Sequence, residues 1–443
     1  MKNNFYFFII AGILVIIGIS IFSIVSLENE LLELSNLEKT DFIPKSSPII
    51  LDTDNPIKVG ILHSLTGTMA LSETSVVDAT LLAIDEINNN GGILGRQVVP
   101  VIVDGKSNWT TFAIEAENLI TKENVSVVFG GWTSASRKTM KPIFEEYDHL
   151  LFYPVQYEGL EQSPNIIYTG AAPNQQVIPA VEWACKNLGD NFFLVGSDYV
   201  FPRSANEILK EKIQHDGAKV VGEEYRILGD DNFVDVVDKI LLAKPDVILN
   251  TINGDSNIAF FKELRSRGIT PQQIPTISFS IAEDEIRHLG SDMMYGDYAS
   301  WNYFQSVSNE QNANFVANFK KKFGEHRVTD DPMEAGYTGV YLYAKAVELA
   351  GTENLKNVRE SLKGVTFSAP EGIVGIDPIN QHLSKVVRIG QIQSNGQFKI
   401  IFSSEEPIEP IPYPQYKTHE QWDAFLNSLY ASWGNSWANP GDI

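Results

Sequence analysis

Cysteine and histidine are scarce in this chain. Among 443 residues there is one cysteine, Cys185, and the seven histidines are scattered. A single cysteine cannot form an intrachain disulfide bond, and no two histidines stand at metal-ligand spacing, so a structural zinc cluster is excluded. We interpret Cys185, in the segment WACKNL, as a small core residue on a helix.

Catalytic signatures are also missing from the sequence. We find no G-x-S-x-G elbow, no G-x-x-x-x-G-K-[ST] loop and no H-E-x-x-H pair. The segment GGILGR (91–96) follows a predicted helix and precedes a predicted strand, the reverse of the order that a dinucleotide-binding loop requires. The sequence therefore predicts a protein that is not an enzyme and has no cofactor or metal. An amidase or urease-like enzyme is the weaker alternative.

Basic residues are outnumbered, with 34 Lys and Arg against 56 Asp and Glu and a net charge of −22. Nucleic acid and anionic membrane surfaces would repel such a chain, so both are excluded as partners. The hydrophobic content of 43% is typical of a folded protein. The length is too great for one core and suits two lobes.

The N-terminus is the exception to this polar composition. Residues 5–25 carry no charge and follow Lys2. About twenty apolar residues span a bilayer, whereas the apolar part of a signal peptide is about half as long. We predict a retained transmembrane anchor (1–27) and a tether (28–55), with the folded part extracytoplasmic. The alternative is a long cleavable signal ending near Ser26, which Ile24 fits poorly.

Apolar strands alternate with helices along most of the folded part. A first series begins at Ile57, and a second series follows the break at residues 170–176. Nearly continuous apolar strands in strand-helix alternation predict parallel, doubly wound sheets. The second series has strands at 192–195, 219–225, 247–250, 276–279 and 297–302. Helices at 309–323, 333–350 and 355–362 and a hairpin at 385–402 follow it.

One strand-turn-helix unit carries most of the polar chemistry. The strand ending at Phe129 passes through Gly130 and Gly131 and starts a helix at Thr133 or Ser134. Glycines allow close approach, and a helix start offers hydroxyl and backbone N–H donors. The next strand ends in Pro154, Gln156 and Tyr157, so two adjacent strand ends are expected to face one crevice.

These loops resemble those of a known family. The segments GGWTSASRK (130–138), FYPVQYEG (152–159), GAAPNQQ (170–176), GSDYVFPR (196–203), NTINGDSN (250–257) and DPMEAGY (331–337) are similar to solute-binding proteins of ABC transporters, in the branch that binds urea and short amides. The resemblance extends over most of the chain. The urea-binding proteins of urea ABC transporters are the most similar group.

The resemblance implies an α/β, type I periplasmic binding protein fold with two lobes joined by a three-crossover hinge. It assigns residues 56–171 and 304–362 to lobe 1, and residues 172–303 and 363–403 to lobe 2. Residues 404–443 form a C-terminal extension. Within this extension, 421–433 has its apolar residues on one helical face, and we favour packing on this chain over packing on a partner.

The resemblance also implies a ligand site at the lobe interface. Urea has one acceptor oxygen and four N–H donors, so its site needs few donors and several acceptors. The implied ligand-binding residues are Trp132, Thr133, Ser134, Tyr153, Gln156, Tyr199 and Asp255. Ser134 and Thr133 are expected at the carbonyl end, and Asp255 is the expected acceptor. Closure of the lobes would then assemble the site.

Each residue also has a purely structural interpretation. Trp132 could be surface packing, Ser134 and Asp255 could cap helices, and Tyr199 could support the hinge. Phe201 stands where some amide-binding relatives have tyrosine, which weakens the case for larger amides. Branched-chain amino acids are an alternative ligand class, with Thr133, Ser134 and Asp255 receiving the charged groups.

The resulting hypothesis is a membrane-anchored extracytoplasmic protein that captures urea and delivers it to an ABC permease. The alternative is an amide or branched-chain amino acid receptor subunit.

Overall fold

The computed structural model describes residues 51–441. The predicted anchor at 1–27 and nearly all of the tether lie outside the described residues. Within the described part of the chain, no helix is long and apolar enough to cross a membrane.

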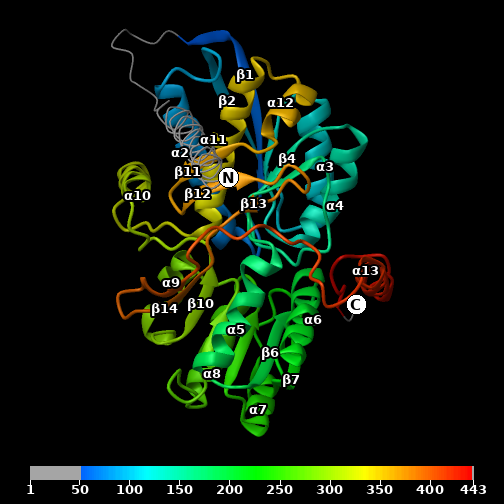
Figure 1. Ribbon diagram of the computed structural model, residues 1–443, viewed down its shortest axis with the longest axis vertical. Helices are drawn as coiled ribbons and strands as arrows, with labels where there is room; N and C mark the ends of the chain where they lie inside the picture. The colour runs from blue at the N-terminus through cyan, green and yellow to red at the C-terminus, as the bar shows by residue number, and fades with distance from the viewer. Residues whose placement is uncertain (1–50, 442–443) are drawn as a thin grey trace, which may run out of the picture. The chain divides into compact units, whose positions relative to one another are not determined.

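The first lobe is built on a five-stranded parallel sheet in the order β2-β1-β3-β4-β5. Its strands are β1 (Asp52–His63), β2 (Arg96–Asp104), β3 (Val128–Gly130), β4 (Leu151–Tyr153) and β5 (Ile166–Tyr168). The helices α2 (Ala70–Asn89), α3 (Trp109–Thr121) and α4 (Ser134–Glu146) connect them (Figure 1). Strands β3, β4 and β5 are buried throughout, as expected of a parallel sheet covered on both faces.

The second lobe contains a seven-stranded sheet in the order β15-β14-β10-β9-β8-β6-β7. Its parallel strands are β6 (Asn191–Ser197), β7 (Lys219–Arg226), β8 (Val247–Thr251), β9 (Thr276–Ser278) and β10 (Tyr298–Trp301). The hairpin of β14 (Arg388–Ile392) and β15 (Phe398–Ser403) joins β10 antiparallel. The helices are α5 (Val177–Asn187), α6 (Val200–His215), α7 (Val234–Ala243), α8 (Ser256–Ser266) and α9 (Glu283–Leu289), with short 3-10 turns at Pro173–Gln175 and Ser291–Met293. The predicted pair of parallel α/β sheets is confirmed.

Later segments return to the first lobe. These are α10 (Glu310–Phe323), α11 (Asp331–Ala350) and α12 (Leu355–Leu362), followed by a small antiparallel sheet of β11 (Thr366–Ala369), β12 (Gly372–Ile376) and β13 (Leu383–Ser384). Ala369, Val374, Ile376 and Leu383 share the hydrophobic core of the first lobe. We therefore propose that the chain crosses to the second lobe after β13, and not at residue 363, where the family resemblance placed the crossing.

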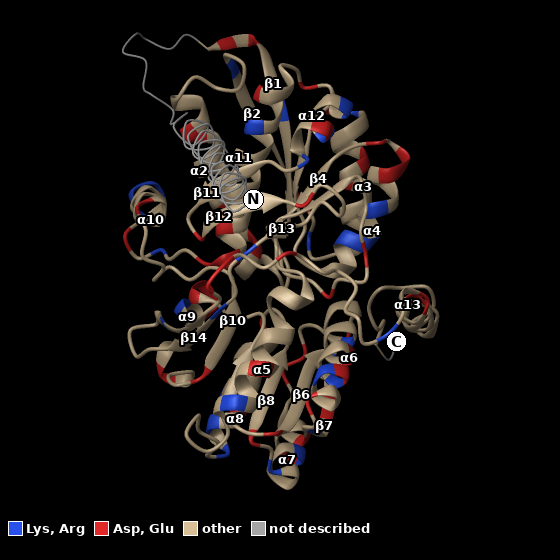
Figure 2. Cartoon of the chain, in the orientation of Figure 1, with Lys and Arg blue, Asp and Glu red and all other residues tan. Residues whose placement is uncertain are grey.

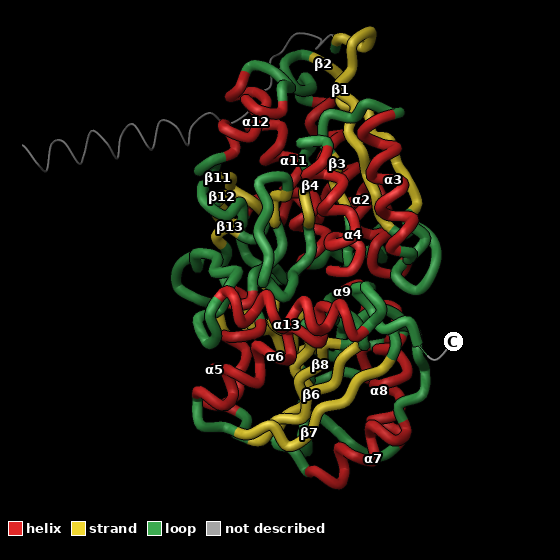
Figure 3. Tube along the Cα trace, turned by 90° about the vertical axis from the view of Figure 1, so that its right-hand side faces the viewer, coloured by secondary structure: helices red, strands yellow, loops and turns green. Residues whose placement is uncertain are grey.

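The C-terminal extension packs on the chain itself. Its helix α13 (His419–Ser432) lies beside α6 (Figure 3), and Trp422 and Leu426 join the core formed by α5, α6 and the second sheet. Before the helix, Ile408 pairs with Lys385, and the carbonyl of Pro412 accepts a hydrogen bond from the backbone N–H of Leu160 at 2.7 Å. The extension thus contacts both lobes close to the crossings between them.

Candidate functional site

The ends of β1 and β3 meet through a glycine pair. A Cβ atom on Gly130 would lie 2.0 Å from the carbonyl oxygen of Leu62, so only glycine allows β3 to approach β1 this closely. Gly131 has a φ of +79° and donates its N–H to that same carbonyl at 2.9 Å. This turn places Trp132 and the start of α4 at the carboxyl edge of the sheet, as the strand-turn-helix pattern predicted.

Thr133 caps α4. Its hydroxyl oxygen accepts from the backbone N–H of Ser136 at 3.1 Å, which satisfies one of the free donors of the first helical turn. The helix cap, which the sequence analysis considered for Ser134, is thus Thr133, and Ser134 is the first residue of the helix. The further role of Thr133 is to position the residue that follows it, Ser134.

Ser134 belongs to a buried charged cluster. Its hydroxyl donates to Glu158 Oε2 and accepts from Arg137 Nη1 at 3.0 Å. Arg137 also pairs with Glu158 Oε1 at 3.0 Å and, through Nε, with Glu161 Oε1 at 2.9 Å. Lys138 Nζ lies 3.0 Å from Glu161 Oε2. All of these side chains are buried, and we call Ser134, Arg137, Lys138, Glu158 and Glu161 the charged cluster.

The ionisation of this cluster follows from its pairing. Burial opposes the charge on Arg137, but Glu161 and Glu158 outweigh it and raise the pKa of Arg137 well above its usual value. Burial likewise opposes the charge on Glu161, yet Lys138 and Arg137 hold the pKa of Glu161 well below its usual value. Both groups are therefore charged at every physiological pH.

Aromatic side chains from both lobes surround Ser134. Tyr153, at the end of β4, donates its hydroxyl to the carbonyl of Trp132, and its ring lies 4.8 Å from the Arg137 guanidinium carbon. Tyr199 comes from the second lobe. Its pKa is raised well above the usual value, first by burial and then by the neighbouring Tyr153 hydroxyl and the charge of Glu158. The structure therefore brings Trp132, Ser134, Tyr153 and Tyr199 together, and all four are buried.

Gln156 joins the two lobes directly. Its Nε2 donates to the carbonyl of Phe279, which follows β9 in the second lobe, at 2.8 Å. Two further bonds cross the same interface, from Ser72 Oγ to Glu285 at 2.7 Å and from Ser75 Oγ to Asp284 at 2.5 Å. The lobes are thus closed on each other in this structure.

Asp255 is placed differently from the other predicted residues. It stands at the start of α8, is exposed, and makes no capping hydrogen bond with its side chain. The loop that carries it does reach the first lobe, because a Cβ on Gly254 would lie 3.1 Å from both Met69 Sδ and Thr68 O. Asp255 therefore lies at the rim of the interface and is not a buried acceptor.

Glu73 is an acidic residue that the sequence analysis did not single out. Its side chain is fully buried at the start of α2, and Oε2 accepts from the backbone N–H of Ser64 at 2.7 Å and faces His63 Nδ1 at 3.1 Å. Its other oxygen, Oε1, has no partner among the described residues. After burial, Tyr153 and Glu158, the charge of Glu73 makes the smallest contribution to the raised pKa of Tyr199. A lone glutamate within a helical pattern offers no sequence signal for this role.

Other polar atoms of this region also have no partner in the described part of the chain. They include Trp132 Nε1, a donor, and Gln156 Oε1, an acceptor, together with His63 Nε2 beside Glu73 and Ser280 Oγ beside Phe279. A buried polar atom without a partner carries a cost of about 1–3 kcal/mol, which a bound ligand can offset. We call Glu73, Trp132, Ser134, Tyr153, Gln156 and Tyr199 the interlobe site.

Acidic residues gather beside this site at the start of α9 (Figure 2). Burial above all raises the pKa of Glu283 to about 8 and the pKa of Glu285 to about 7. On α11, burial and then Glu371 raise the pKa of Glu334 to about 8. Within residues 51–441, no group of His, Cys, Asp or Glu side chains could hold a metal ion.

These raised pKa values predict that the free energy of unfolding falls as the pH rises. A carboxyl group whose pKa is higher in the folded state than in the unfolded state stabilises the fold at pH values below its unfolded pKa, near 4.5. This stabilisation is lost as the pH rises through its folded pKa, here about 7–8. We expect the free energy of unfolding, measured with guanidinium chloride, to fall between pH 5 and pH 8.5. Glu161 does not add to this trend, because its depressed pKa matters only in acid. A flat or rising profile would contradict the assignment.

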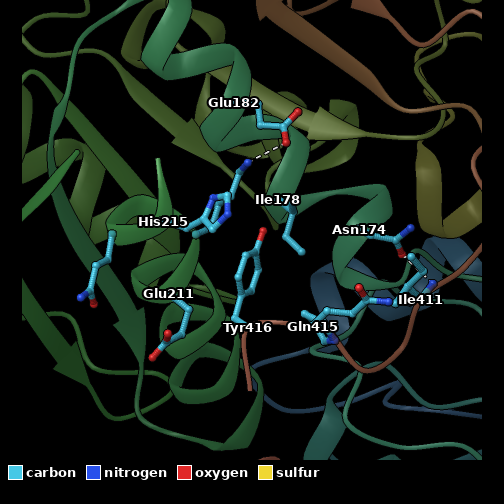
Figure 4. A pocket seen from close by; sticks show the side chains of 11 residues that line it. Asn174, Ile178, Glu182, Glu211, His215, Ile411, Gln415 and Tyr416 are labelled. Carbon is cyan, nitrogen blue, oxygen red and sulfur yellow. Dashed lines mark hydrogen bonds and ion pairs between the residues drawn. The ribbon is translucent and has the colours of Figure 1, made fainter. Parts of the chain in front are cut away.

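A separate groove of 820 Å³ lies on the outer side of the second lobe. Helices α5 and α6 and the segment before α13 form it (Figure 4). In it, Lys212 Nζ donates to Glu182 at 2.6 Å, and the N–H of Ile411 donates to Asn174 Oδ1 at 2.8 Å. None of the residues predicted from the sequence lines this groove.

The chain is similar to several known proteins. It is 20% identical over 347 residues to Leu/Ile/Val-binding protein homolog 6 of Brucella melitensis, covering 76% of this chain and 87% of that protein. It is 23% identical over 330 residues to the leucine-, isoleucine-, valine-, threonine- and alanine-binding protein of Pseudomonas aeruginosa, covering 72% and 86%.

A shorter match of 36% identity over 124 residues is to limonene hydroxylase of Geobacillus stearothermophilus, covering 28% of this chain. The chain spans only 23% of that protein's length, so no activity is inferred from it.

Solved structures agree with the fold. A solute-binding protein of an ABC transporter from Rhodopseudomonas palustris, in complex with p-hydroxybenzoic acid, matches with a TM-score of 0.73 at 21% identity, covering 80% of this chain and 98% of that one. A leucine-binding protein from Thermotoga maritima matches with a TM-score of 0.70 at 22% identity, covering 78% and 98%.

A family model described as the periplasmic binding protein domain matches residues 57–419. The relatives that match over most of their length are solute-binding proteins of ABC transporters, a class that binds and delivers small molecules and does not catalyse reactions. This chain therefore belongs to the type I periplasmic binding protein family, the extracytoplasmic Leu/Ile/Val-binding-like solute-binding proteins of ABC transporters.

Proposed function

We propose that this protein captures urea between its two lobes and delivers it to an ABC permease, held at the membrane by its N-terminal segment (1–27). The observation that carries the proposal is the polarity of the interlobe site. Its unpartnered acceptor atoms outnumber its unpartnered side-chain donor, and urea is rich in N–H groups and has one carbonyl oxygen.

The free hydrogen-bond donors and acceptors of the interlobe site can be compared with those of urea. Trp132 Nε1 is a free donor for one carbonyl oxygen, whereas Glu73 Oε1 and Gln156 Oε1 are free acceptors. The Tyr153 hydroxyl already donates to Trp132 O, so toward a ligand its oxygen can only accept. Free backbone N–H groups in the first turn of α4 add donors at the carbonyl end. Together these groups match urea in number and in kind.

The dimensions of the site also favour a small guest. In the closed structure Trp132, Tyr153 and Tyr199 are exposed by no more than 3%. Gln156 reaches across to the second lobe at hydrogen-bond distance. Urea is a planar molecule of four heavy atoms, so the lobes need to open little further to admit it. A ligand with a branched aliphatic side chain would need the lobes to open much more.

Two alternatives have specific support. Short amides such as acetamide and formamide present the same carbonyl and one N–H₂ group. Branched-chain amino acids are bound by relatives of this chain according to their names, and Glu73 and the start of α4 offer partners for an ammonium and a carboxylate. In the second case the protein would serve as an amino acid transporter component or receptor subunit.

Calorimetric titration of the full-length chain with urea, acetamide, formamide and leucine tests the proposal. We expect urea to bind more tightly than the other three ligands. Glu73→Gln should weaken urea binding by about tenfold or more, because it replaces a charged acceptor by a neutral one. Asp255→Ala is the matched control at the rim of the interface and should have a smaller effect.

Two outcomes would contradict this proposal. Leucine binding without urea binding would remove the urea assignment and favour the amino acid alternative. A larger loss for Asp255→Ala than for Glu73→Gln would place the principal acceptor at the rim, as the sequence analysis expected.

A further inference from the structure

We propose that Arg137 and Glu158 fix the direction of the Ser134 hydroxyl, so that Ser134 accepts an N–H group of the ligand and cannot donate to a carboxylate. The inference rests on the proposed function, since it concerns how the same site distinguishes amides from carboxylates. It also reverses the expectation that Ser134 donates to the ligand carbonyl.

The proton assignment follows from the partners of the hydroxyl. Arg137 has only donors, so its Nη1, 3.0 Å away, occupies one lone pair of Ser134 Oγ. Glu158 is ion-paired with Arg137 and, as a carboxylate, only accepts, so the single proton of Ser134 points to Glu158 Oε2. One lone pair and no proton remain for a ligand.

Neither partner can turn away. Arg137 is fully buried and is held by Glu161 through Nε and by the ring faces of Tyr153 and Tyr157 at 4.8 and 4.4 Å. The segment that carries Glu158 is held by backbone hydrogen bonds, from the N–H of Tyr157 to Ala171 O at 3.1 Å and from the N–H of Leu160 to Pro412 O. The orientation is therefore built in before a ligand arrives, and Arg137 and Glu158 act as positioning residues.

The consequence is selection by hydrogen-bond polarity. An amide brings an N–H to Ser134 Oγ and gains a hydrogen bond. A carboxylate of the same shape turns an oxygen toward Ser134 Oγ instead of an N–H group. No proton lies between the two oxygens, so the hydrogen bond is lost and their lone pairs repel each other. Acetamide and acetate form such an isosteric pair, which differs only in this group.

The substitution Glu158→Gln should reverse the direction in which the Ser134 hydroxyl points its proton. Arg137 Nη2 donates at the position of Glu158 Oε1, so the oxygen of the new amide must occupy that place and its N–H₂ must face Ser134. Ser134 Oγ would then accept from both neighbours, and its proton would be free to point to the ligand. Glu161→Gln is the matched control, because Glu161 is also buried and paired with Arg137, but Ser134 is not among its hydrogen-bond partners.

The experiment measures the affinity ratio of acetamide to acetate on the full-length chain, with acetate measured by competition against urea. We expect the ratio to fall by about tenfold or more in Glu158→Gln and to stay within about twofold in Glu161→Gln. Ser134→Ala should lower the ratio, and Ser134→Thr, which keeps the oxygen, should restore it. These two variants leave both charged partners in place, so they test the inference even where Glu158→Gln does not fold.

Failure of this inference is distinguishable from failure of the proposed function. Equal ratios in the wild type and in both Ser134→Ala and Glu158→Gln, with urea still bound, overturn the inference alone. Equal changes in Glu158→Gln and Glu161→Gln also overturn it, because they would reflect general loss of charge. If the wild type binds leucine and not urea, the proposed function fails, and leucinamide and leucine then replace the amide and carboxylate pair.

Discussion

Replacing Arg137 with methionine is expected to lower the free energy of unfolding by about 3–5 kcal/mol. Methionine replaces the aliphatic stem of Arg137 but not its guanidinium, so Glu158 and Glu161 lose one of the two buried cations that they share, Lys138 being the other. Lys138 still contacts Glu161 at 3.0 Å, so the loss should lie toward the lower end of this range. Denaturation with guanidinium chloride, followed by circular dichroism, measures it.

The control for this prediction is Arg267→Met. Arg267 also has two carboxylate partners, Asp238 and Glu263, but it lies at the surface, where solvent screens the pairing. We expect a far smaller change than at Arg137. Similar losses in the two variants would mean that burial of the charged cluster contributes nothing beyond ordinary ion pairing.

Replacing Trp422 with alanine is the second change with a large expected effect, a loss of about 3–5 kcal/mol in the free energy of unfolding. Trp422 is fully buried on α13, and its Nε1 donates to the carbonyl of Pro414 at 2.9 Å. Lys417 Nζ lies 4.8 Å from the centre of its ring. The alanine variant leaves a cavity and an unpartnered carbonyl between the extension and α6.

The effect should extend to the interlobe site. Beyond α13, the carbonyl of Trp437 accepts from the N–H of Val200 at 2.9 Å, and Asn439 bonds the backbone and side chain of Asp198. These contacts hold the turn that carries Tyr199. We therefore expect Trp422→Ala to increase proteolytic cleavage of the extension and to weaken urea binding. Phe425→Ala, on the same helix but only partly buried, should do less in both assays. Equal effects of the two variants would show that Trp422 is not the anchor.

The sequence predicted the two-sheet architecture because the signals are local. The apolar segment that ends at Phe129, followed by Gly130, Gly131 and the capping Thr133, determines a strand, a turn and a helix from neighbouring residues alone. Parallel strands ending at one edge then placed Trp132, Ser134, Tyr153 and Gln156 near each other. Resemblance supplied the crossings between lobes, which no periodicity indicates.

What the sequence by itself determined is the set of elements and the residues at the ends of the strands. Tertiary structure alone decided which polar groups face each other. The fold alone buries Glu73 against His63 and Ser64 at the carboxyl end of β1, and it leaves Asp255 at the rim although the loop of Asp255 looks suitable for an acceptor. The direction of the Ser134 proton depends on Arg137 and Glu158, which lie on α4 and after β4. Such hydrogen-bond directions are set by burial and by partners distant along the chain. A short sequence pattern contains no information on either.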